Sequence, residues 1–365
     1  MLNYFFLLEI NKVLIEGGFL MIDTISISFP TVKHIFFALV YSMNNYLKSE
    51  NSYLMKDDSD SSRSRYTTKL SSIGFLEIAF HFDSHHYYLK IKLQPIRLID
   101  EGEIIDLVKA KDFNFIEKSF NYYMKDIFGD SFFKYSLQFD NWKLSRIDYA
   151  VNYYTEYVSQ LMEILHKGNI CTGFTYKDYE DSLYLTSDAV NINFYDKYAQ
   201  LINKPYVDYS SIDPAKNILR FEVQCKSEEI YRLKKDLKLA DLSIKTFWNA
   251  SIVAYVIKNR IKAIIGSQNF LDINFAKSII EKKYKKNYLT LFAILDNIQQ
   301  SNNLQTAKET FLDSFPNCSP NKYDKYFVKI RKCKVNPITI PADFLYIDKI
   351  FPNPYNSIDS LILNF

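Results

Sequence analysis

Three short segments with strand-like alternation each carry ionisable side chains at every second position. They are Leu144–Tyr153, Val190–Lys197 and Ile218–Cys225. Successive side chains of a strand point to opposite faces, so alternate residues share a face. This alternation predicts an apolar face and a polar face, and the polar face carries Arg146, Asp148, Asn152, Asn193, Tyr195, Lys197, Arg220, Glu222 and Gln224. If the strands are neighbours in one sheet, two carboxylates, a tyrosine and a lysine lie together.

The composition is that of a folded protein with more than one domain. The chain has 365 residues, 48% of them hydrophobic, with only 8 Gly and 10 Pro. A chain of this length exceeds one small core, and its apolar content is too high for a disordered protein. We therefore expect two domains plus terminal segments.

The charge distribution favours a polyanionic partner. The formal net charge is only +3, but Lys and Arg concentrate in short clusters after Glu222. A cationic half of a chain suits nucleic acid. The alternative interpretation is that these clusters are the solvated faces of ordinary helices.

The cysteine pattern and the hydropathy indicate a cytoplasmic protein. Four cysteines, at 171, 225, 318 and 333, show no paired metal-ligand spacing, which suits free thiols in a reducing compartment. No run of 18 apolar residues is present, so we expect no membrane span.

Residues 1–20 read as a non-native or dispensable extension. Their apolar run is interrupted by Glu9, Lys12 and Glu16, which argues against a signal peptide. Glu16-Gly-Gly can be encoded by a purine-rich string that resembles a ribosome-binding site just upstream of Met21. We therefore expect translation to start at Met21.

The local patterns from residue 21 to 265 predict an α+β domain with a largely antiparallel central sheet and flanking helices. We expect a strand from Met21 that ends at Pro30, a helix over 31–47, a mobile loop over 49–72, and a hairpin from strands 73–82 and 87–93. Helices are expected over 113–128, ending at Gly129, and over 156–166.

Beyond residue 225 the pattern becomes helical. We expect helices over 228–237, 243–265, 274–284, 288–300, 304–315 and 321–333, followed by an extended tail. Residues 266–365 thus form a helical C-terminal domain, which is either a winged-helix-like DNA-binding unit or a bundle that braces the sheet.

The strand motifs resemble a known family. Arg146-Ile-Asp148, then Leu183-Tyr-Leu-Thr-Ser187 leading into Asn193-Phe-Tyr-Asp-Lys197, then Leu219-Arg-Phe-Glu222 occur in the order found in rolling-circle replication initiators. The most similar group is the phage and plasmid gene II-like or Rep_trans-like replication proteins. The resemblance covers roughly residues 140 to 226.

The resemblance implies a nicking enzyme that joins itself to one DNA strand through tyrosine. It assigns Asp148 and Glu222 as ligands of Mg²⁺ or Mn²⁺, Tyr195 as the nucleophile, and Lys197 as its cationic neighbour. Where many relatives carry a second acid, this chain has Asn152, which offers a carbonyl oxygen without charge.

Elementary chemistry supports this assignment independently. A divalent ion on hard oxygen ligands neutralises charge at a phosphate, and a tyrosine with a pKa near ~10 needs activation before it attacks. Tyr184 is the main rival nucleophile. His81, which alternation places on one face with Asp83, is a candidate third metal ligand. The Arg–Asp and Arg–Glu pairs are alternatively structural ion pairs.

The sequence therefore leaves two alternative classes of function. One is a metal-dependent nickase that produces a 5′-phosphotyrosyl intermediate and a 3′-OH primer at a plasmid or phage origin; a relaxase or transposase would share this chemistry. The other is a non-catalytic DNA-binding regulator or degenerate initiator. Expected partners are origin DNA, a host helicase and polymerase, and a second copy in a homodimer. The expected DNA contacts are Arg146, Arg220, Lys282, Lys283, Lys285, Lys286, Arg331 and Lys332.

Overall fold

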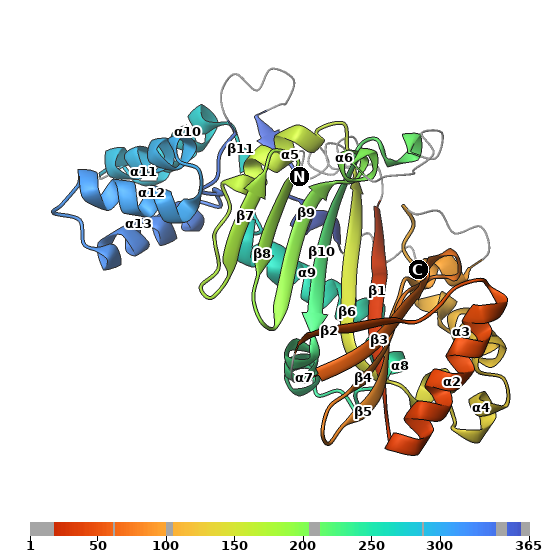
Figure 1. Ribbon diagram of the computed structural model, residues 1–365. Coiled ribbons are helices and arrows are strands. Elements are labelled where there is room, and N and C mark those ends of the chain that lie inside the picture. The colour runs from red at the N-terminus through yellow and green to blue at the C-terminus, as the bar shows by residue number, and fades with distance from the viewer. Residues whose placement is uncertain are drawn as a thin grey trace.

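One large antiparallel sheet organises the protein (Figure 1). The computed structural model describes residues 18–60, 63–99, 105–203, 212–286, 288–340 and 349–358. The sheet has ten strands in the order β2-β3-β4-β5-β1-β6-β10-β9-β8-β7, and every pairing in it is antiparallel. The strands are β1 Gly18–Thr31, β2 Met55–Asp60, β3 Arg63–Leu70, β4 Phe75–Phe82, β5 Tyr87–Leu93, β6 Lys143–Tyr154, β7 Thr175–Tyr179, β8 Ser182–Thr186, β9 Val190–Asp196 and β10 Ile218–Lys226.

Helices flank this sheet and dominate the C-terminal region, so the predicted α+β class is confirmed. The helices are α2 Lys33–Ser49, α3 Phe113–Phe128, α4 Asp130–Lys134, α5 Val158–His166, α6 Lys197–Ile202, α7 Ser227–Asp236, α8 Ile244–Phe247, α9 Ala250–Ile265, α10 Ile273–Lys283, α11 Tyr288–Gln300, α12 Leu304–Ser314 and α13 Pro320–Lys332. Helix α3 ends, as predicted, at Gly129, whose φ of 54° suits a residue without a side chain.

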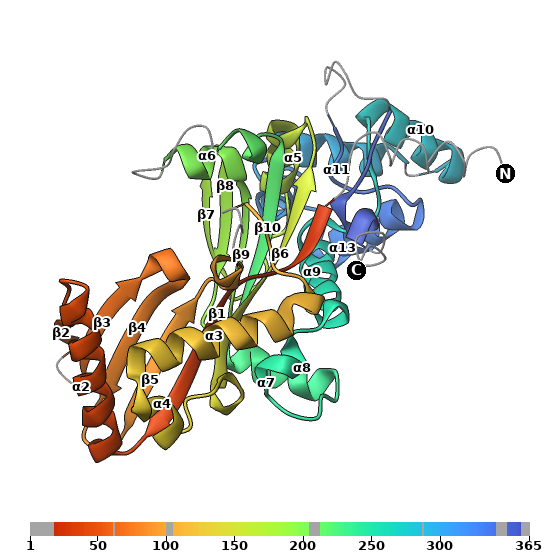
Figure 2. The same ribbon diagram turned by 90° about the vertical axis from the view of Figure 1, so that its right-hand side faces the viewer.

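The long helices α2, α3, α5, α7 and α9 pack against one face of the sheet (Figure 2). That face is apolar because the alternate residues of each strand that point to it are hydrophobic, such as Ile147, Val151 and Phe221. Phe36 of α2, for example, meets Phe80 of β4 with ring centroids 5.9 Å apart. The opposite, polar face is left without this helical layer.

Three local predictions were wrong in detail. The stretch 49–72 contains β2 and β3, which close the sheet at one edge; their polar residues suit an edge strand. Strand β1 continues through Pro30 to Thr31, because pairing with β6 has already ended at Ser28 and Pro30 pairs only with β5. The single helix expected over 243–265 is broken around Trp248 into α8 and α9.

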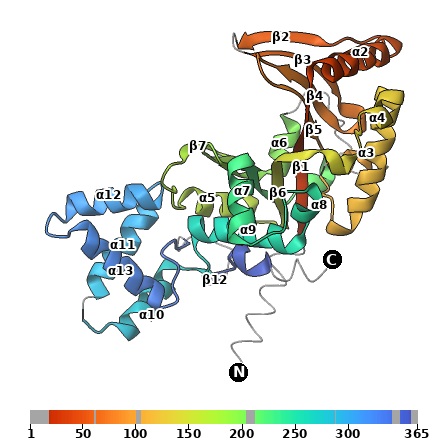
Figure 3. The same ribbon diagram turned by 90° about the horizontal axis from the view of Figure 1, so that it is seen from below.

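The C-terminal helices α10 to α13 enclose a hydrophobic cluster of their own. They lie beyond the β7 edge of the sheet, away from β2 to β5 (Figure 3). A two-stranded sheet of β11 (Phe270–Leu271) and β12 (Ile350–Phe351) lies at their start. The winged-helix interpretation of residues 266–365 stays a prediction.

The predicted extension 1–20 lies mostly outside the described residues, which begin at Gly18. Residues 18–20 form the start of β1 and pair with Tyr153, Asn152 and Val151 of β6. These three residues are therefore part of the sheet. Across the described ranges, none of the helices combines the length and the hydropathy that a bilayer crossing demands.

Candidate functional site

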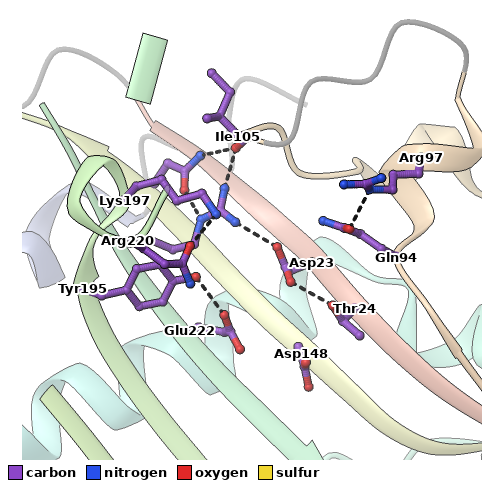
Figure 4. A network of polar contacts seen from close by, with 12 residues as sticks. Asp23, Thr24, Gln94, Arg97, Ile105, Asp148, Tyr195, Lys197, Arg220 and Glu222 are labelled. Carbon is purple, nitrogen blue, oxygen red and sulfur yellow. Dashed lines mark hydrogen bonds and ion pairs between the residues drawn. The ribbon is translucent and has the colours of Figure 1, made fainter. Parts of the chain in front are cut away.

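The three motif strands are neighbours, in the order β6, β10 and β9. Arg220 lies opposite Asn152 on one side and opposite Tyr195 on the other, while Glu222 lies opposite Ala150 and Asn193. Directly opposed residues share a face, so the polar side chains of all three strands gather on the face opposite helices α2, α3, α5, α7 and α9. Figure 4 shows this cluster, with Glu222 between Tyr195 and Asp148.

Tyr195 and Glu222 form the centre of the cluster. The Tyr195 hydroxyl donates to Oε2 of Glu222 at 3.1 Å, and Nε2 of Gln224 donates to Oε1 of Glu222 at 2.6 Å. Asn191 in turn donates to Gln224 at 2.9 Å. Both oxygens of Glu222 are thus engaged, and residues Tyr195 and Glu222 are 4% and 6% exposed.

Arg146 and Asp148 form a bidentate pair. Nε and Nη2 of Arg146 donate to the two oxygens of Asp148 at 2.7 and 2.6 Å. Asp148 is 1% exposed, whereas Arg146 is half-buried. The predicted structural ion pair therefore exists within β6.

Arg220 is fully buried and ties three segments together. Its Nε donates to Oδ1 of Asn152 at 2.7 Å, its Nη1 to Oδ1 of Asp23 at 2.8 Å, and its Nη2 to the carbonyl of Ile105. Asn152 also donates to that carbonyl, at 3.0 Å. The expected DNA contact of Arg220 is not available here, because its guanidinium faces only protein groups.

Lys197 is the first residue of α6, beyond the end of the strand in which we expected it. Its ammonium lies 5.8 Å from the centroid of the Tyr195 ring and donates to Gln200 at 2.9 Å. Asp196, the N-cap of α6, turns the chain at this point. Lys197 is thus near the predicted nucleophile, and its ammonium lies over the face of the Tyr195 ring.

Burial controls the protonation of the cluster. It raises the pKa of Asp148 to about 7, with the charges of Glu222 and Asp23 adding to the rise and Arg146 opposing it. Burial and Asp23 likewise raise the pKa of Glu222. Burial and Glu222 raise the pKa of the Tyr195 phenol well above its usual range, so the phenol is neutral at rest.

The carboxylate oxygens of the cluster are of the type that a hard divalent cation prefers, but each carboxylate is already hydrogen-bonded to protein groups. Asp148, Glu222 and Asp23 supply carboxylate oxygens on one face, where Asp23 raises the pKa of both Asp148 and Glu222, and Glu222 raises that of Asp148. Among the residues described, however, no group of three or more His, Cys, Asp or Glu is arranged to hold a metal. A cation would take the place of the Arg146 guanidinium at Asp148.

Two predicted metal ligands are not available: His81 is too far from the acids, and Asn152 lies on the expected face with its amide already engaged. Strands β5 and β1 separate His81 on β4 from β6, which at ~4.8 Å per strand puts it about 14 Å away. His81 therefore cannot share a cation with Asp148 and Glu222. Asn152 uses its amide oxygen and nitrogen on Arg220 and Ile105.

Tyr184, the rival nucleophile, lies on β8 opposite Asn193 and hence on the polar face. Its ring packs edge-on against Tyr179 with centroids 6.1 Å apart. It is more exposed than Tyr195, but β9 separates it from Glu222.

The predicted cationic residues of the C-terminal region come together. The ammonium of Lys283, at the end of α10, donates to the carbonyl of Lys332 at the end of α13. We call this surface the helical basic patch, and it comprises the exposed residues Lys282, Lys283, Lys285, Lys286, Arg331 and Lys332. It lies on the helical region, away from the sheet cluster (Figure 3).

Two members of the site were missed by sequence reasoning. Asp23 lies at a register shift between Ile22 and Thr24 in β1, where an extra residue redirects a side chain that simple alternation assigns to the other face. Ile105 contributes only its carbonyl, and its segment covers the polar face at Ala150 through Leu107. A main-chain contact of this kind cannot be predicted from residue identity, because every residue has a backbone carbonyl.

The fold and site define an α+β protein with an open-faced antiparallel sheet and a buried acid–tyrosine–arginine cluster. Comparison with protein-family models gives no match, and comparison with curated proteins gives none of significance. The resemblance to replication initiators therefore remains a prediction from the motifs.

Proposed function

We propose that this protein is a metal-dependent, DNA strand-nicking and rejoining enzyme that initiates rolling-circle replication. The observation that carries the proposal is the hydrogen bond from the Tyr195 hydroxyl to Glu222. A nucleophile in contact with a base, beside further acids and a lysine, is the arrangement that phosphodiester transfer to tyrosine requires.

Glu222 is suited to take the proton of Tyr195. Its Oε2 accepts the hydrogen bond from the Tyr195 hydroxyl, which places the carboxylate within reach of that proton. The phenolate oxygen then forms a bond to phosphorus, the bond from phosphorus to the 3′ oxygen breaks, and that oxygen gains a proton from solvent. The products are a 5′-phosphotyrosyl link and a 3′-OH, and the reverse reaction rejoins the strand.

Asp148 and Glu222 are the residues that would hold the Mg²⁺ or Mn²⁺. When bound, the ion supplies Lewis-acid neutralisation of a phosphate oxygen. Lys197 holds a positive charge at the Tyr195 ring, and Arg220 fixes the Asp23 and Asn152 side chains. Because Tyr195 is only 4% exposed, a phosphate can reach its hydroxyl only after the groups that bury it move.

A non-catalytic DNA-binding protein is the second candidate. The pairing of both Asp148 oxygens with Arg146 favours it, since a paired acid serves structure rather than a metal. In that case the polar face holds the protein together, and DNA contacts come from cationic surfaces alone.

Nicking of supercoiled DNA that carries the origin distinguishes these candidates. With Mg²⁺ or Mn²⁺, we expect open circles and a covalent protein–DNA adduct, and Tyr195→Phe should reduce both by at least ~1,000-fold. Binding of the same DNA without any nicking would overturn the enzyme proposal and support the second candidate.

Two tyrosine variants serve as controls. Tyr149→Phe also removes one hydrogen bond of a buried tyrosine, to the Phe247 carbonyl, but on the opposite face of the sheet, so it should retain nicking. Tyr184→Phe tests the rival nucleophile. An adduct that persists in Tyr195→Phe and disappears in Tyr184→Phe would transfer the role to Tyr184.

A further inference from the structure

A hollow lies on the same polar face, at the end of the sheet formed by β3, β4, β5 and β1. It is a cavity of about 790 Å³, which we call the sheet groove. Its lining residues include Arg65, His81, Tyr88, Ser28, Lys90 and Lys143. A cavity of this size is in the range of ~300–1,000 Å³ that holds a ligand of a few rings.

The strand register explains why these side chains meet. His81 lies opposite Arg65 on one side and opposite Tyr88 on the other. Ser28 lies opposite Lys90 and also opposite Lys143. Each cross-strand pair shares a face, so the cations and the rings converge on the polar face.

The cations of the sheet groove exceed its acids. Lys90 and Lys143 make no hydrogen bond or ion pair through their ammonium groups with the described part of the chain. Arg65 pairs with Glu77 at 3.3 Å. The lining acid, Asp83, is occupied by the backbone amides of His85 and His86 at 2.8 Å each.

Crowding of like charges at Lys90 points to an anionic ligand. Burial lowers the pKa of Lys90, and the positive charges of Arg146, Arg65 and Lys92 lower it further, while Glu77 opposes. An anion at the groove would relieve this repulsion. Arg146 also belongs to the Asp148 pair, so the groove adjoins the Tyr195 cluster.

The groove also offers an aromatic platform. The rings of His81 and Tyr88 are stacked, with centroids 4.8 Å apart and planes at 9°. Both residues are partly exposed. Stacked rings beside unpaired ammonium groups are the combination that binds unpaired bases and their phosphates.

We infer that the sheet groove binds single-stranded DNA, with a base against the Tyr88–His81 pair and phosphates at Lys90 and Lys143. This inference rests on the proposed function, because it assigns the groove to the same strand that Tyr195 cuts. The groove would hold that strand on the polar face while its scissile phosphate reaches the cluster.

Fluorescence anisotropy with a labelled 15-nucleotide oligo-dT, in EDTA, tests the groove without nicking. We expect Tyr88→Ala to weaken binding roughly 5- to 100-fold, the range given by loss of one stacked base, while Tyr88→Phe retains binding. The double variant Lys90→Gln/Lys143→Gln should flatten the dependence of log K on log salt by about 0.7 for each lost phosphate contact.

The controls separate the groove from the nicking site and from unfolding. Lys118→Gln removes an exposed charge on α3, across the sheet, and should leave binding unchanged. Tyr195→Phe should also bind normally in EDTA, so a failed nicking reaction leaves this inference standing. Unchanged affinity in folded Tyr88→Ala and Lys90→Gln/Lys143→Gln would overturn it, as would equal competition by duplex DNA of the same length.

Discussion

The two ends of the polar face use charge in opposite ways. At the β6, β10 and β9 end, arginines face acids at hydrogen-bond distance, and Arg220, Asp148 and Glu222 are almost completely buried. At the β3 to β5 end, Lys90 and Lys143 line an open groove, and neither forms an ion pair with the described residues. The charges at the β6, β10 and β9 end therefore stabilise the protein, whereas those at the β3 to β5 end are placed to attract a ligand.

This difference follows from solvent access. Buried charges are tolerated only when they are paired and hydrogen-bonded, whereas exposed ones need no partner. The Ile105 segment covers the first end and gives Arg220 and Asn152 an acceptor there. The groove is an open cavity, so Lys90 and Lys143 in its lining remain accessible to phosphate.

The largest expected effect is loss of stability when the buried end loses a cation. Arg220→Met removes the guanidinium that pairs with the Asp23 carboxylate and donates to the Asn152 amide oxygen, and leaves the Ile105 carbonyl with only its bond from Asn152. Removal of one partner of a buried pair costs about 3–5 kcal/mol. Urea denaturation followed by circular dichroism measures the change in the free energy of unfolding.

Lys143→Gln is the matched change at the open end. Its side chain is exposed, so we expect the free energy of unfolding to change by no more than about ±0.5 kcal/mol.

A second variant covers the case in which Arg220→Met does not accumulate as folded protein. Its combination with Asp23→Asn removes both charges and should recover part of the lost stability. Equal effects of Arg220→Met and Lys143→Gln would show that the two ends do not differ.

A smaller effect is expected in the pH dependence of stability. Asp148 has a pKa of about 7 in the folded protein and near ~3.9 when unfolded, so the folded state binds the extra proton between these values. Stability contributed by this group is therefore present below pH ~4 and is lost as the pH rises to about 7. The loss is at most about 4 kcal/mol at 1.36 kcal/mol per pH unit.

The Asp148→Asn variant isolates the contribution of the Asp148 carboxyl to the pH dependence of stability. Denaturation of both proteins from pH 4 to 8 should give a difference in unfolding free energy that changes through this window and is constant above it. A difference that does not vary with pH would show that Asp148 stays ionised beside Arg146. That result would strengthen the interpretation of the pair as structural.

The polar face could be predicted from the sequence because it depends on a period of two. Strand alternation assigned Asp148, Tyr195 and Glu222 to one face, and this required only that the strands be neighbours. Local periodicity gave the helices in the same way. The hairpin of β4 and β5 was also predictable from its short polar turn.

The remaining features depend on tertiary structure. Asp23 joins Arg220 only because of a shift in strand register. β3 forms from a polar stretch because β4 offers it an edge, and β2 then pairs with β3. The pairing of His81 with Tyr88, which creates the groove platform, depends on the register between β4 and β5. None of these features has a local sequence signal.

The smallest effect on stability is expected at the helical basic patch. The triple variant Lys282→Gln/Lys285→Gln/Lys286→Gln removes exposed charges at the end of α10, so each change should alter the unfolding free energy by no more than about 0.5 kcal/mol. If the patch binds duplex DNA, the slope of log K against log salt should fall by about 0.9 for each lost phosphate contact.

Comparison of duplex and single-stranded DNA separates this patch from the sheet groove. The triple variant should weaken duplex binding while it leaves binding of oligo-dT unchanged, because the patch lies beyond the opposite edge of the sheet (Figure 3). Lys322→Gln, near the start of α13 and away from the patch, is the control. Unchanged duplex binding in the triple variant would identify the patch as an ordinary solvated surface and leave the sheet face as the site of DNA contact.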